Sequence, residues 1–559
     1  MTLSYEEAVA QITAPGERYE TTEIDVGGVT YTAFKGAPGT LKDLFDLTRL
    51  YGDTEYLVYE DERYTYAEVY ARADGIAAAL VNDYGVVKGD RVAIAMRNYP
   101  EWIFTYLGAI SIGAVIVSMN AWWTPDEMAY GLEDSGAKVL VADVERVERS
   151  RDAAAALGIR TIGVRLPAGD VPDSVERWED VVVVGAERPD VAIDPDDDAT
   201  ILYTSGTTGN PKGAVSTHRA VIQALMGFGC KSSIDSLRRP EEAAGRTGAP
   251  VFILIVPLFH VTGNVPVFLG SLISGLKLVV MHKWDAGRAL QLIERERVTN
   301  FIGVPTQSWD LLEHPDFEKY DTSTLTSVGG GGAPAPPQLV GRVGSSFKTA
   351  KPNIGYGMTE TNAYGPGNSG IDYESRPTST GRSTPILEVE IRDPELHAVP
   401  AGELGEIWMK GPNVIRGYWN KPEATAETIV DGWLRTGDLG RMDAEGFVYI
   451  EDRAKDMILR GGENVYSAEV EAAIYEHPAV YEAAVFGLPH ERLGEEVAVA
   501  IVPRDGQAID TDELRTFLAE RIAPFKIPTQ VFLFDEALPR NPAGKILKRQ
   551  LRDDLTAQA

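Results

Sequence analysis

The chain has 559 residues, more than one hydrophobic core normally holds, so its length predicts several domains. Its net charge of −30, from 53 basic and 83 acidic residues, opposes sequence-independent binding to nucleic acid and to anionic membranes. An anionic small molecule must therefore meet a locally positive site. The single cysteine, Cys230, excludes an intramolecular disulfide and a cysteine-rich metal site.

Neither end of the sequence carries a recognisable targeting signal, because residues 1–7 lack the basic and apolar regions of a signal peptide. The apolar stretch 249–276 contains no Asp, Glu, Lys or Arg, but Pro250, Pro257 and Pro266 divide it into pieces too short to span a membrane. We therefore expect a soluble, cytoplasmic protein without a transmembrane segment and with at most peripheral membrane contact.

Residues 91–142 alternate between apolar strands and helices. Strands are predicted at 91–96, 115–118 and 138–142, and helices at 101–114 and from 124 to about 136. The second helix begins with a capping box, Thr124 to Glu127, with Pro125 at its first position. This βαβαβ order predicts a mainly parallel sheet that helices cover on both faces.

A second cycle of the same kind follows. Its predicted strands are 199–203, 251–256, 276–281 and 299–303, and its predicted helices are 216–228 and 285–297. Short strands with frequent Gly and Asp between about 386 and 451 then predict a small β-rich subdomain. The large domain is thus expected to contain two α/β sheets and this subdomain.

Residues 454–559 return to helix–strand alternation and predict a small α+β C-terminal domain. The N-terminal domain would span 1–453, with the boundary near 453–455. Ser467 is predicted to cap a helix that ends near Glu476, and Asp510 to open another helix. The predicted fold class is α/β, with two doubly covered, mainly parallel sheets in the large domain and a small mobile domain after it.

The segment 204–213, Thr-Ser-Gly-Thr-Thr-Gly-Asn-Pro-Lys-Gly, directly follows a predicted buried strand. Its three glycines let the backbone approach phosphate oxygens, its four hydroxyl-bearing residues can donate to them, and Lys212 adds a mobile positive charge. It is not a Walker A loop, because no Gly directly precedes Lys212 and no Ser or Thr follows it. Taken alone, the segment predicts either a polyphosphate-binding loop or an ordinary solvated turn.

Four further segments each carry one residue with a chemical use. Glu360, after a Gly-Tyr-Gly turn, could hold Mg²⁺, and Asp438 could accept hydrogen bonds from ribose hydroxyls. Arg453 could reach a ribose or a phosphate, and a mobile small domain could deliver Lys545 to a developing negative charge. Taken alone, each residue also has an ordinary explanation. Glu360 could be a solvated loop glutamate and Asp438 an Asx-turn residue. Arg453 could belong to a charged interdomain linker, and Lys545 could be a surface charge.

Together, these segments resemble the adenylate-forming superfamily of acyl-CoA synthetases, luciferases and peptide-synthetase adenylation domains. The similarity covers nearly the whole chain in order, through segments 204–213, 329–334, 356–360, 436–438, 452–455 and 544–545. It implies an N-terminal AMP-binding (adenylation) domain and a reaction in two steps. A carboxylate attacks the α-phosphorus of ATP, giving acyl-adenylate and magnesium pyrophosphate, and a nucleophile, usually the thiol of coenzyme A, then displaces AMP.

The resemblance also implies roles for individual residues. The implied catalytic residues are Lys545, Glu360, Thr204 and Lys212, with Glu360 as the ligand of Mg²⁺ and Lys455 as the hinge. The implied nucleotide-binding residues are Thr204, Ser205, Gly206, Thr207, Thr208, Gly209 and Lys212 at the phosphate loop, Gly332, Ala333 and Pro334, Gly355, Tyr356, Gly357, Met358 and Thr359, then Asp438, Arg453 and Lys545. The implied acyl and coenzyme A channel is lined by His260, Val261, Asn264, Gly331, Gly357, Gly461 and Gly462. His260 would be an aromatic gate, the alternative being a satisfied core histidine.

Differences between this sequence and particular members of the superfamily narrow the range of expected substrates. Residues 261–265 contain no carboxylate to pair with an α-ammonium group, which disfavours an amino acid. Gly357 stands where acetate-specific members carry Trp, which favours a medium or long aliphatic acid or a bulky alicyclic or aromatic one. No carrier-protein domain follows Lys545, so free coenzyme A is the expected acceptor, with ATP and Mg²⁺ as the other requirements.

Three points stay open from the sequence. The charged segment 231–246 is expected to be a surface loop, the alternative being a cap over the acyl entrance. A luciferase-like enzyme, or another adenylate-forming enzyme with an acceptor other than coenzyme A, is an alternative function. A non-catalytic nucleotide-binding protein is a remote one, which the presence of both Glu360 and Lys545 disfavours. The expected partners are small molecules and not nucleic acid, and a homodimer is left open.

Overall fold

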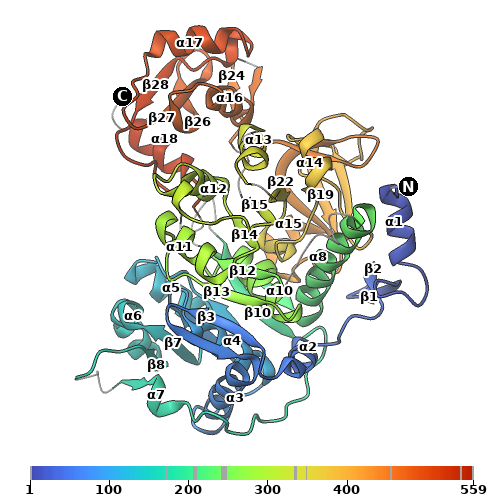
Figure 1. The fold of residues 1–559 in the computed structure, drawn as a ribbon, viewed down its shortest axis with the longest axis vertical. Helices are drawn as coiled ribbons and strands as arrows, with labels where there is room; N and C mark the ends of the chain where they lie inside the picture. Colours follow the sequence, from blue (N-terminus) through green and yellow to red (C-terminus); the bar gives the residue numbers. More distant parts are fainter. Residues whose placement is uncertain are drawn as a thin grey trace.

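The computed structural model describes residues 3–169, 174–204, 211–240, 249–332, 337–347, 349–453, 456–461, 463–541 and 544–556. Two large sheets, two small sheets and an N-terminal hairpin, β1 (Thr21–Val26) and β2 (Val29–Phe34), make up its β-structure. In Figure 1 the large sheets occupy the lower and middle part of the molecule, and the C-terminal segment, in red, lies at the top.

The first large sheet has eight strands in the order β20-β11-β10-β6-β5-β7-β8-β9. The strands from β10 to β9 are parallel, whereas β11 and β20 are antiparallel to their neighbours. The strands are β5 (Arg91–Ala95), β6 (Val115–Ser118), β7 (Val139–Asp143), β8 (Arg160–Val164), β9 (Val175–Arg177), β10 (Asp198–Thr204), β11 (Lys212–Thr217) and β20 (Gly417–Tyr418). The predicted parallel core is confirmed; β11, which begins within the last two residues of the glycine-rich segment, was not predicted.

The second large sheet also has eight strands, in the order β17-β16-β15-β14-β12-β13-β3-β4. Its six central strands are parallel and both edge strands are antiparallel. The strands are β3 (Glu55–Tyr59), β4 (Glu62–Thr65), β12 (Val251–Leu254), β13 (Lys277–Val280), β14 (Asn300–Gly303), β15 (Ser327–Gly331), β16 (Lys351–Gly355) and β17 (Gly367–Ser369). Both sheets therefore match the predicted α/β class.

Helices cover and separate these sheets (Figure 1). They are α1 (Tyr5–Ile12), α2 (Leu41–Thr48), α3 (Tyr66–Asn82), α4 (Pro100–Ser111), α5 (Pro125–Ser135), α6 (Val144–Leu157), α7 (Trp178–Val181), α8 (His218–Arg238), α10 (Gly270–Ile273), α11 (Ala286–Glu296), α12 (Pro305–Leu312), α13 (Pro337–Ser346) and α14 (Gly370–Ser375). Short 3₁₀ turns are η1 (Arg49–Tyr51), η3 (Phe317–Lys319) and η4 (Thr359–Thr361), and η2 (Gly263–Leu269) is π-helical.

Helix α4 is the centre of the large domain, because every one of its residues is buried. It packs on β5 and β6 of the first sheet, Trp102 meets Phe268 of η2, and Phe104 meets Tyr64 of β4 in the second sheet. The sequence predicted an apolar face for this helix. A helix that is buried on all sides reflects its position between two sheets.

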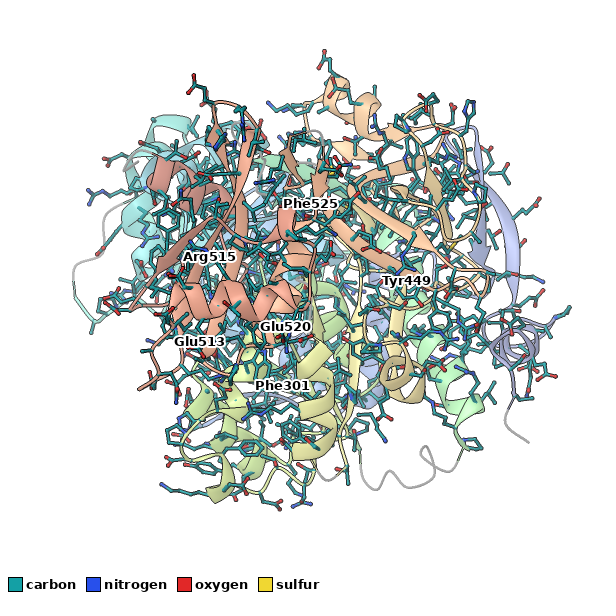
Figure 2. The ribbon with its side chains drawn as sticks, turned by 90° about the horizontal axis from the view of Figure 1, so that it is seen from above. Phe301, Tyr449, Glu513, Arg515, Glu520 and Phe525 are labelled. Atoms are coloured by element: carbon teal, nitrogen blue, oxygen red, sulfur yellow. The ribbon has the colours of Figure 1, made fainter. Side chains whose placement is uncertain are left out.

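The β-rich sheet contains β18 (Glu388–Arg392), β19 (Gly405–Lys410), β21 (Ile429–Val430), β22 (Trp433–Met442) and β23 (Val448–Arg453), with α15 (Pro422–Thr428) beside it. The C-terminal sheet contains β24 (Ile458–Arg460), β25 (Glu463–Val465), β26 (Val480–His490), β27 (Gly494–Pro503) and β28 (Gln530–Leu533). Helices α16 (Ser467–Tyr475), α17 (Thr511–Ala519) and α18 (Lys548–Thr556) and turn η5 (Pro524–Lys526) complete this smaller domain. Figure 2 shows α17, marked by Glu513 and Glu520, on its outer face and the β-rich sheet with Tyr449 beside it. The exact boundary near 453–455 stays a prediction.

Two local predictions were wrong. Ser467 does not cap α16 but is its first residue, because its N–H and hydroxyl both donate to the carboxylate of Asp452, at 2.5 and 3.1 Å. The segment 231–246 was predicted as a surface loop, but α8 continues to Arg238, so its first half is helical; residues 241–246 lie outside the described structure. Its charged side chains are stabilised by partners such as Asp372 of α14, at 2.5 Å from Arg238.

The apolar stretch 249–276 folds as β12, η2 and α10, which are short separate elements. Within the described residues, no helix combines the length and the apolar character needed to cross a membrane.

Candidate active site

Asp438, Arg453 and Tyr356 meet at the end of the second large sheet. Strands β22 and β23 pair so that Asp438 lies opposite Arg453, and the Arg453 Nε lies 3.3 Å from the Asp438 Oδ1. Tyr356, directly after β16, donates a hydrogen bond of 2.5 Å to Asp438 Oδ2. Asp438 is only 6% exposed, and burial together with this carboxylate raises the pKa of Tyr356 well above its usual value. The site is a buried carboxyl acceptor of the kind that ribose hydroxyls require.

Glu360 is also buried, at 6% exposure, and lies in the short turn η4. The hydroxyl of Tyr418 donates a hydrogen bond of 2.7 Å to Glu360 Oε1. Lys212 Nζ lies 5.0 Å from the centre of the Tyr418 ring. Strand β20 brings Tyr418 there by pairing with β11, which begins at Lys212. Tyr418 is not among the residues predicted from the sequence, although the aromatic pair Tyr418-Trp419 after a glycine was a visible signal.

The turn that carries Glu360 is held by amide side chains. Asn362 donates to the carbonyl of Asn413 at 3.0 Å, Asn413 donates to the carbonyl of Thr361 at 3.0 Å, and Ser216 donates to Asn362 at 2.9 Å. Gly357 closes the turn, because a Cβ there would lie 2.3 Å from the carbonyl oxygen of Ala363. Close backbone approach is therefore a second reason for glycine at position 357, besides the expected open pocket.

Lys545 reaches this site from the C-terminal domain. Its backbone N–H donates to the Asn541 side chain at 2.9 Å, and Gly544 before it adopts a φ of +85°. A Cβ on Gly544 would lie 2.8 Å from Val304 Cγ2, so the lysine turn rests on the start of α12 in the large domain. Burial and the positive charge of Arg453 lower the pKa of Lys545 to about 8, against the opposing influence of Asp456 and Asp438. Lys545 therefore lies close enough to Asp438 and Arg453 for their charges to influence its pKa.

His260 lies next to this lysine. Burial and the positive charge of Lys545 lower the pKa of His260 to about 4, so its imidazole is neutral at pH 7. The N–H of Thr262 donates to His260 Nδ1 at 3.4 Å. Val261 is buried, and Asn264 is 1% exposed with a side-chain amide nitrogen that has no partner among the described residues. That these residues line a channel stays a prediction.

The remaining predicted residues divide into described and undescribed ones. Thr204 ends β10 and its hydroxyl donates to the Lys212 carbonyl at 3.3 Å. Gly355 is exposed at the end of β16, Gly331 ends β15 beside it, Gly332 has a φ of +78°, and Gly461 packs on Leu493 within the small domain. Met358 donates its N–H to Thr361, and Thr359 begins η4. Outside the described residues lie Ser205, Gly206, Thr207, Thr208, Gly209, Ala333, Pro334, Lys455 and Gly462.

A basic cluster that the sequence analysis missed lies at the carboxyl ends of β5, β6 and β7. The chain order reverses at β5, which has β6 on one side and β7 on the other, and such a switch point is where open α/β sheets bind ligands. Arg97 follows β5 and lies 5.1 Å from the ring of Trp122, which is 46% exposed. Arg146 follows β7, and His282 follows β13 of the other sheet. We call Arg97, Trp122, Arg146 and His282 the switch-point cluster.

This cluster has unused hydrogen-bonding capacity. Among the described residues, no carboxylate pairs with the Arg97 side chain, and Arg146 Nη2 and His282 Nδ1 are buried without a partner. Burial and the nearby charge of Arg146 lower the pKa of Arg97. Buried polar groups are normally satisfied, so these two nitrogens are unusual in lacking a partner among the described residues, although Arg146 itself is paired with Asp143 and Glu145.

Asn98 connects this cluster with His260. Its side-chain amide donates to the carbonyls of Val256 and Met281, both at 3.1 Å, and its oxygen accepts from the N–H of Leu258 at 2.9 Å. These bonds join the end of β5 to the segments that follow β12 and β13, and His260 comes two residues after Leu258. The arrangement fixes the cluster relative to the channel segment.

Two side-chain contacts join the domains above α12. Tyr481 of β26 donates to Asp310 Oδ1 at 2.6 Å, and Arg504 pairs with Glu313. Asp310 is itself fixed by the indole N–H of Trp284, at 2.8 Å. The domains are thus held in an orientation that points Lys545 into the large domain.

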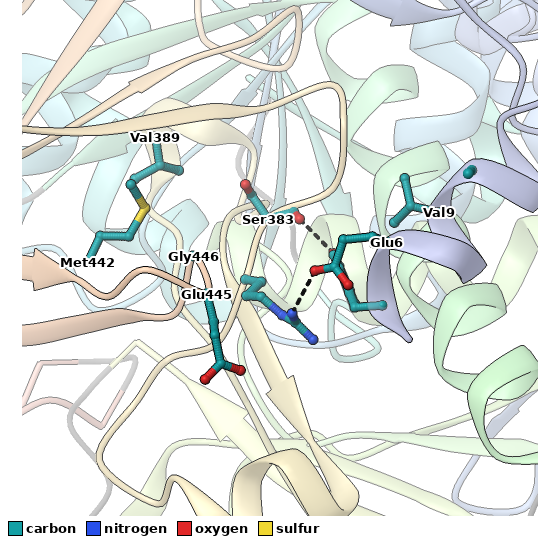
Figure 3. A pocket seen from close by; sticks show the side chains of 10 residues that line it. Glu6, Val9, Ser383, Val389, Met442, Glu445 and Gly446 are labelled. Atoms are coloured by element: carbon teal, nitrogen blue, oxygen red, sulfur yellow. Dashed lines mark hydrogen bonds and ion pairs between the residues drawn. The ribbon is translucent and has the colours of Figure 1, made fainter. Parts of the chain in front are cut away.

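A surface pocket of about 380 Å³ lies elsewhere, between α1 and the β-rich sheet (Figure 3). Glu6 and Val9 line one side, and Met442 and Glu445 line the other. None of the residues predicted for the site lines this pocket, so it carries no part of the chemistry considered below. In the described part of the chain, no three His, Cys, Asp or Glu residues gather as a metal site.

Comparisons with known proteins agree with this geometry. The AMP-binding enzyme family matches residues 46–419, and the AMP-binding enzyme C-terminal domain matches residues 469–545. A feruloyl-CoA synthase of Amycolatopsis sp is 37% identical over 498 residues, 87% of this chain and 93% of the relative. The long-chain-fatty-acid–CoA ligase FadD13 of Mycobacterium tuberculosis is 36% identical over 504 residues, which cover 89% of this chain and 94% of the relative.

A solved structure shows the same overall arrangement. The o-succinylbenzoate CoA synthetase of Bacillus subtilis, in complex with its acyl-adenylate intermediate, gives a TM-score of 0.77 at 30% identity, covering 91% of this chain and 98% of that one. The chain therefore belongs to the AMP-binding enzyme family, as an adenylate-forming enzyme of the acyl-CoA synthetase type.

Proposed function

We propose that this acyl-CoA synthetase activates a carboxylic acid at the Lys545–Asp438 site and transfers the acyl group to free coenzyme A. The observation that carries the proposal is the convergence of Lys545, Arg453 and Asp438 from two domains, with buried Glu360 in the neighbouring turn. A surface lysine would keep its usual pKa, whereas the lowered pKa of Lys545 indicates a desolvated, functional position.

In the first step an oxygen of the acid attacks the α-phosphorus of ATP, and the bond to the bridging oxygen breaks as pyrophosphate leaves. Both reacting groups are anionic, so positive charge and positioning must lower the barrier. Lys545 would place its ammonium at the carboxylate and the α-phosphate, while Asp438 and Arg453 hold the ribose. Thr204 and Lys212 would contact the β- and γ-phosphates.

Magnesium fits the proposed phosphate end of the site. Mg²⁺ is usually bound by one or two carboxylates together with substrate phosphates, so a single buried carboxylate is a suitable donor set. Glu360 has one hydroxyl donor, Tyr418, and no paired cation among the described residues. When bound, Mg²⁺ would neutralise charge on the phosphates.

In the second step the sulfur of coenzyme A attacks the acyl carbonyl carbon, the bond to AMP breaks, and a proton is released. The neutral imidazole of His260 would form an aromatic wall of the channel rather than a charged one, because its pKa is about 4. We expect the C-terminal domain to turn about Lys455 between the steps, which would withdraw Lys545 and present the segment of Gly461 and Gly462.

The switch-point cluster favours coenzyme A as the acceptor. Coenzyme A carries phosphates and an adenine, and the cluster offers the side chain of Arg97, which no carboxylate pairs among the described residues, and the exposed ring of Trp122. Guanidinium groups bind phosphate oxygens, and an aromatic ring can stack on adenine. Asn98 ties this cluster to the His260 segment, so the thiol arm would extend from the cluster toward the acyl-adenylate.

The acid is proposed to be a medium or long aliphatic acid or a bulky alicyclic or aromatic one. Gly331 and Gly357 add no side-chain bulk, and in the described part of the chain a Cβ at Gly355 would meet no atom within 4 Å. A screen of such acids for ATP- and coenzyme A-dependent AMP release tests the proposal. AMP release with at least one acid, and a hydroxylamine-trappable adenylate without coenzyme A, would support it.

The same screen separates the alternatives. Light emission or CO₂ release with oxygen would identify a luciferase-like reaction, and adenylate formation without thioester would identify another acceptor. Absence of any adenylate with a broad panel would overturn the enzymatic proposal.

A further inference from the structure

Helix α8 runs ten residues beyond the predicted end at 228, and this extension carries a lysine that the proposed reaction does not use. The side chain of Lys231 crosses strand β17, since a Cβ on Gly367 would lie 2.7 Å from Lys231 Cε and 3.2 Å from its Cδ. A glycine at position 367 therefore makes room for the lysine stem.

Gly367 lies one strand from Gly355, a residue that the resemblance assigns to nucleotide binding, and Gly355 in turn pairs with Gly331, which is predicted to line the acyl channel. Strand β17 pairs with β16 so that Gly367 is directly opposite Gly355, and opposite residues of an antiparallel pair share one face of a sheet. On that face a Cβ at Gly355 would meet no atom of the described residues within 4 Å. Lys231 thus lies one strand, about 5 Å, from the unfilled space over Gly355.

One helical turn before Lys231, the same face of α8 also packs closely against the residues that precede Gly367. Gly227, four residues before Lys231 and on the same helix face, packs on the ring of Tyr364, to which a Cβ would come within 2.5 Å. Gly227 and Lys231 therefore cover residues 364–367, directly after the turn of Glu360.

The ammonium of Lys231 has spare hydrogen-bonding capacity. Its side chain is 18% exposed, and among the described residues its one ion pair is with Asp235, at 3.9 Å, beyond hydrogen-bond distance. Asp235 already accepts from Ser369 at 2.6 Å and pairs with Arg239 at 3.4 Å. Burial lowers the pKa of Lys231, as expected for an ammonium without full compensation.

The neighbouring cations do not share this property. Arg238 makes an ion pair of 2.5 Å with Asp372, and Arg382 pairs with Glu6 at 3.4 Å and stacks on the Tyr5 ring at 3.8 Å. Lys231 is therefore the cation of this group that is suited to a ligand. Asn264, with its unpartnered amide nitrogen in the proposed channel segment, is a second buried donor on the large domain.

We propose that Lys231 is a specificity-determining residue that binds a second carboxylate on the acid substrate, away from the carboxylate that is adenylated. The inference rests on the proposed function and names its substrate class: an acid with an anionic oxygen group at its far end. A substrate of this class would supply the acceptors that Lys231 lacks, and a simple alkanoate would leave the buried ammonium unpaired.

Matched acid pairs test the inference. Hexanoate and adipate, octanoate and suberate, decanoate and sebacate, and 3-phenylpropanoate and 3-(4-carboxyphenyl)propanoate differ by the second carboxylate. For each pair, kcat/KM for AMP release is measured in the wild type, in Lys231→Met, which keeps the stem on Gly367, and in Lys231→Arg. Arg238→Gln is the matched control on the same helix.

We expect the wild type to prefer the dicarboxylate in at least one pair. Lys231→Met should lower that preference ten- to a hundredfold through KM, with the matched monocarboxylate unchanged, and Lys231→Arg should restore part of it. An unchanged preference in Lys231→Met, an equal loss in Arg238→Gln, or a wild type that favours every monocarboxylate would overturn the inference while leaving the proposed ligase intact. Failure of both acid series in the wild type would overturn the proposed function itself, and this inference with it.

Discussion

The hydroxyl of Tyr418 donates a 2.7 Å hydrogen bond to the buried carboxylate of Glu360, which is 58 residues earlier in the chain. The same aromatic ring faces the ammonium of Lys212 at 5.0 Å. Tyr418 therefore connects the proposed metal ligand with the proposed phosphate-binding lysine, and it does so from a strand of only two residues.

Tyr418→Phe should weaken the first half-reaction. The change removes a hydrogen bond to a charged group, worth about 1.5–3 kcal/mol, so pyrophosphate release should slow about tenfold or more. The Mg²⁺ concentration that gives half-maximal rate should rise, because Glu360 loses the group that orients it. Tyr449→Phe, which removes a hydroxyl bonded to Asp443 at 3.2 Å in the β-rich sheet, is the control. An equal effect of both variants would contradict the role of Tyr418.

Lys545→Ala should abolish adenylate formation and leave thioester formation from supplied acyl-AMP largely intact. The reason is that Lys545 is proposed to act at the α-phosphate only before the C-terminal domain turns. The two half-reactions are measured separately, by pyrophosphate release and by acyl-CoA formation. Equal loss of both steps would refute the assigned role.

The first half-reaction should lose rate at alkaline pH. The pKa of Lys545 is lowered to about 8, so its ammonium form is present below pH 8 and is lost as the pH rises through this value. The kcat/KM for ATP in pyrophosphate release, measured without coenzyme A, should therefore fall above about pH 8. The corresponding fall in kcat should occur at higher pH, because bound phosphate stabilises the ammonium form of Lys545 and so raises its pKa. A flat profile to pH 9.5 would show that the charge of Lys545 is not required.

Tyr481→Phe should shift the balance between the half-reactions. It removes the 2.6 Å hydrogen bond to Asp310 that joins the domains, and so destabilises the orientation in which Lys545 points into the large domain. Adenylate formation should slow severalfold, by about 1 kcal/mol, while thioester formation from acyl-AMP is unchanged or faster. Arg521→Gln, which removes a pair with Glu476 inside the small domain, should affect neither step. Equal slowing of both steps would argue against this interdomain contact as a control of orientation.

Arg97→Gln should raise the KM for coenzyme A about tenfold or more, because it removes a charged donor to a phosphate. Adenylate formation should be unaffected, since coenzyme A takes no part in it. Arg151→Gln on α6, an exposed residue paired with Asp152 at 3.4 Å, is the control. An unchanged KM for coenzyme A in Arg97→Gln would place its phosphates elsewhere.

The sequence predicted the large-domain fold well because its elements are defined locally. The capping box at Thr124 and the glycine at 136 bound α5 as expected, since both act within one helical turn. Strand β11 was missed, because its antiparallel pairing with β10 is a contact between strands that no pattern within either strand specifies. The position of Ser467 was misjudged for a similar reason, because the carboxylate that receives its N–H belongs to another sheet.

For the site, the sequence alone determined which reactive groups the chain contains and their order: the glycine-rich segment, Glu360, Asp438, Arg453 and Lys545. Short motifs fix residue types because each chemical task needs a particular functional group. Only the tertiary structure decided what surrounds these groups. Tyr418 meets Glu360, Asn98 joins two sheets, and Lys231 crosses Gly367, each through contacts between residues far apart in the chain. Such contacts depend on strand register and helix packing, which no local pattern specifies.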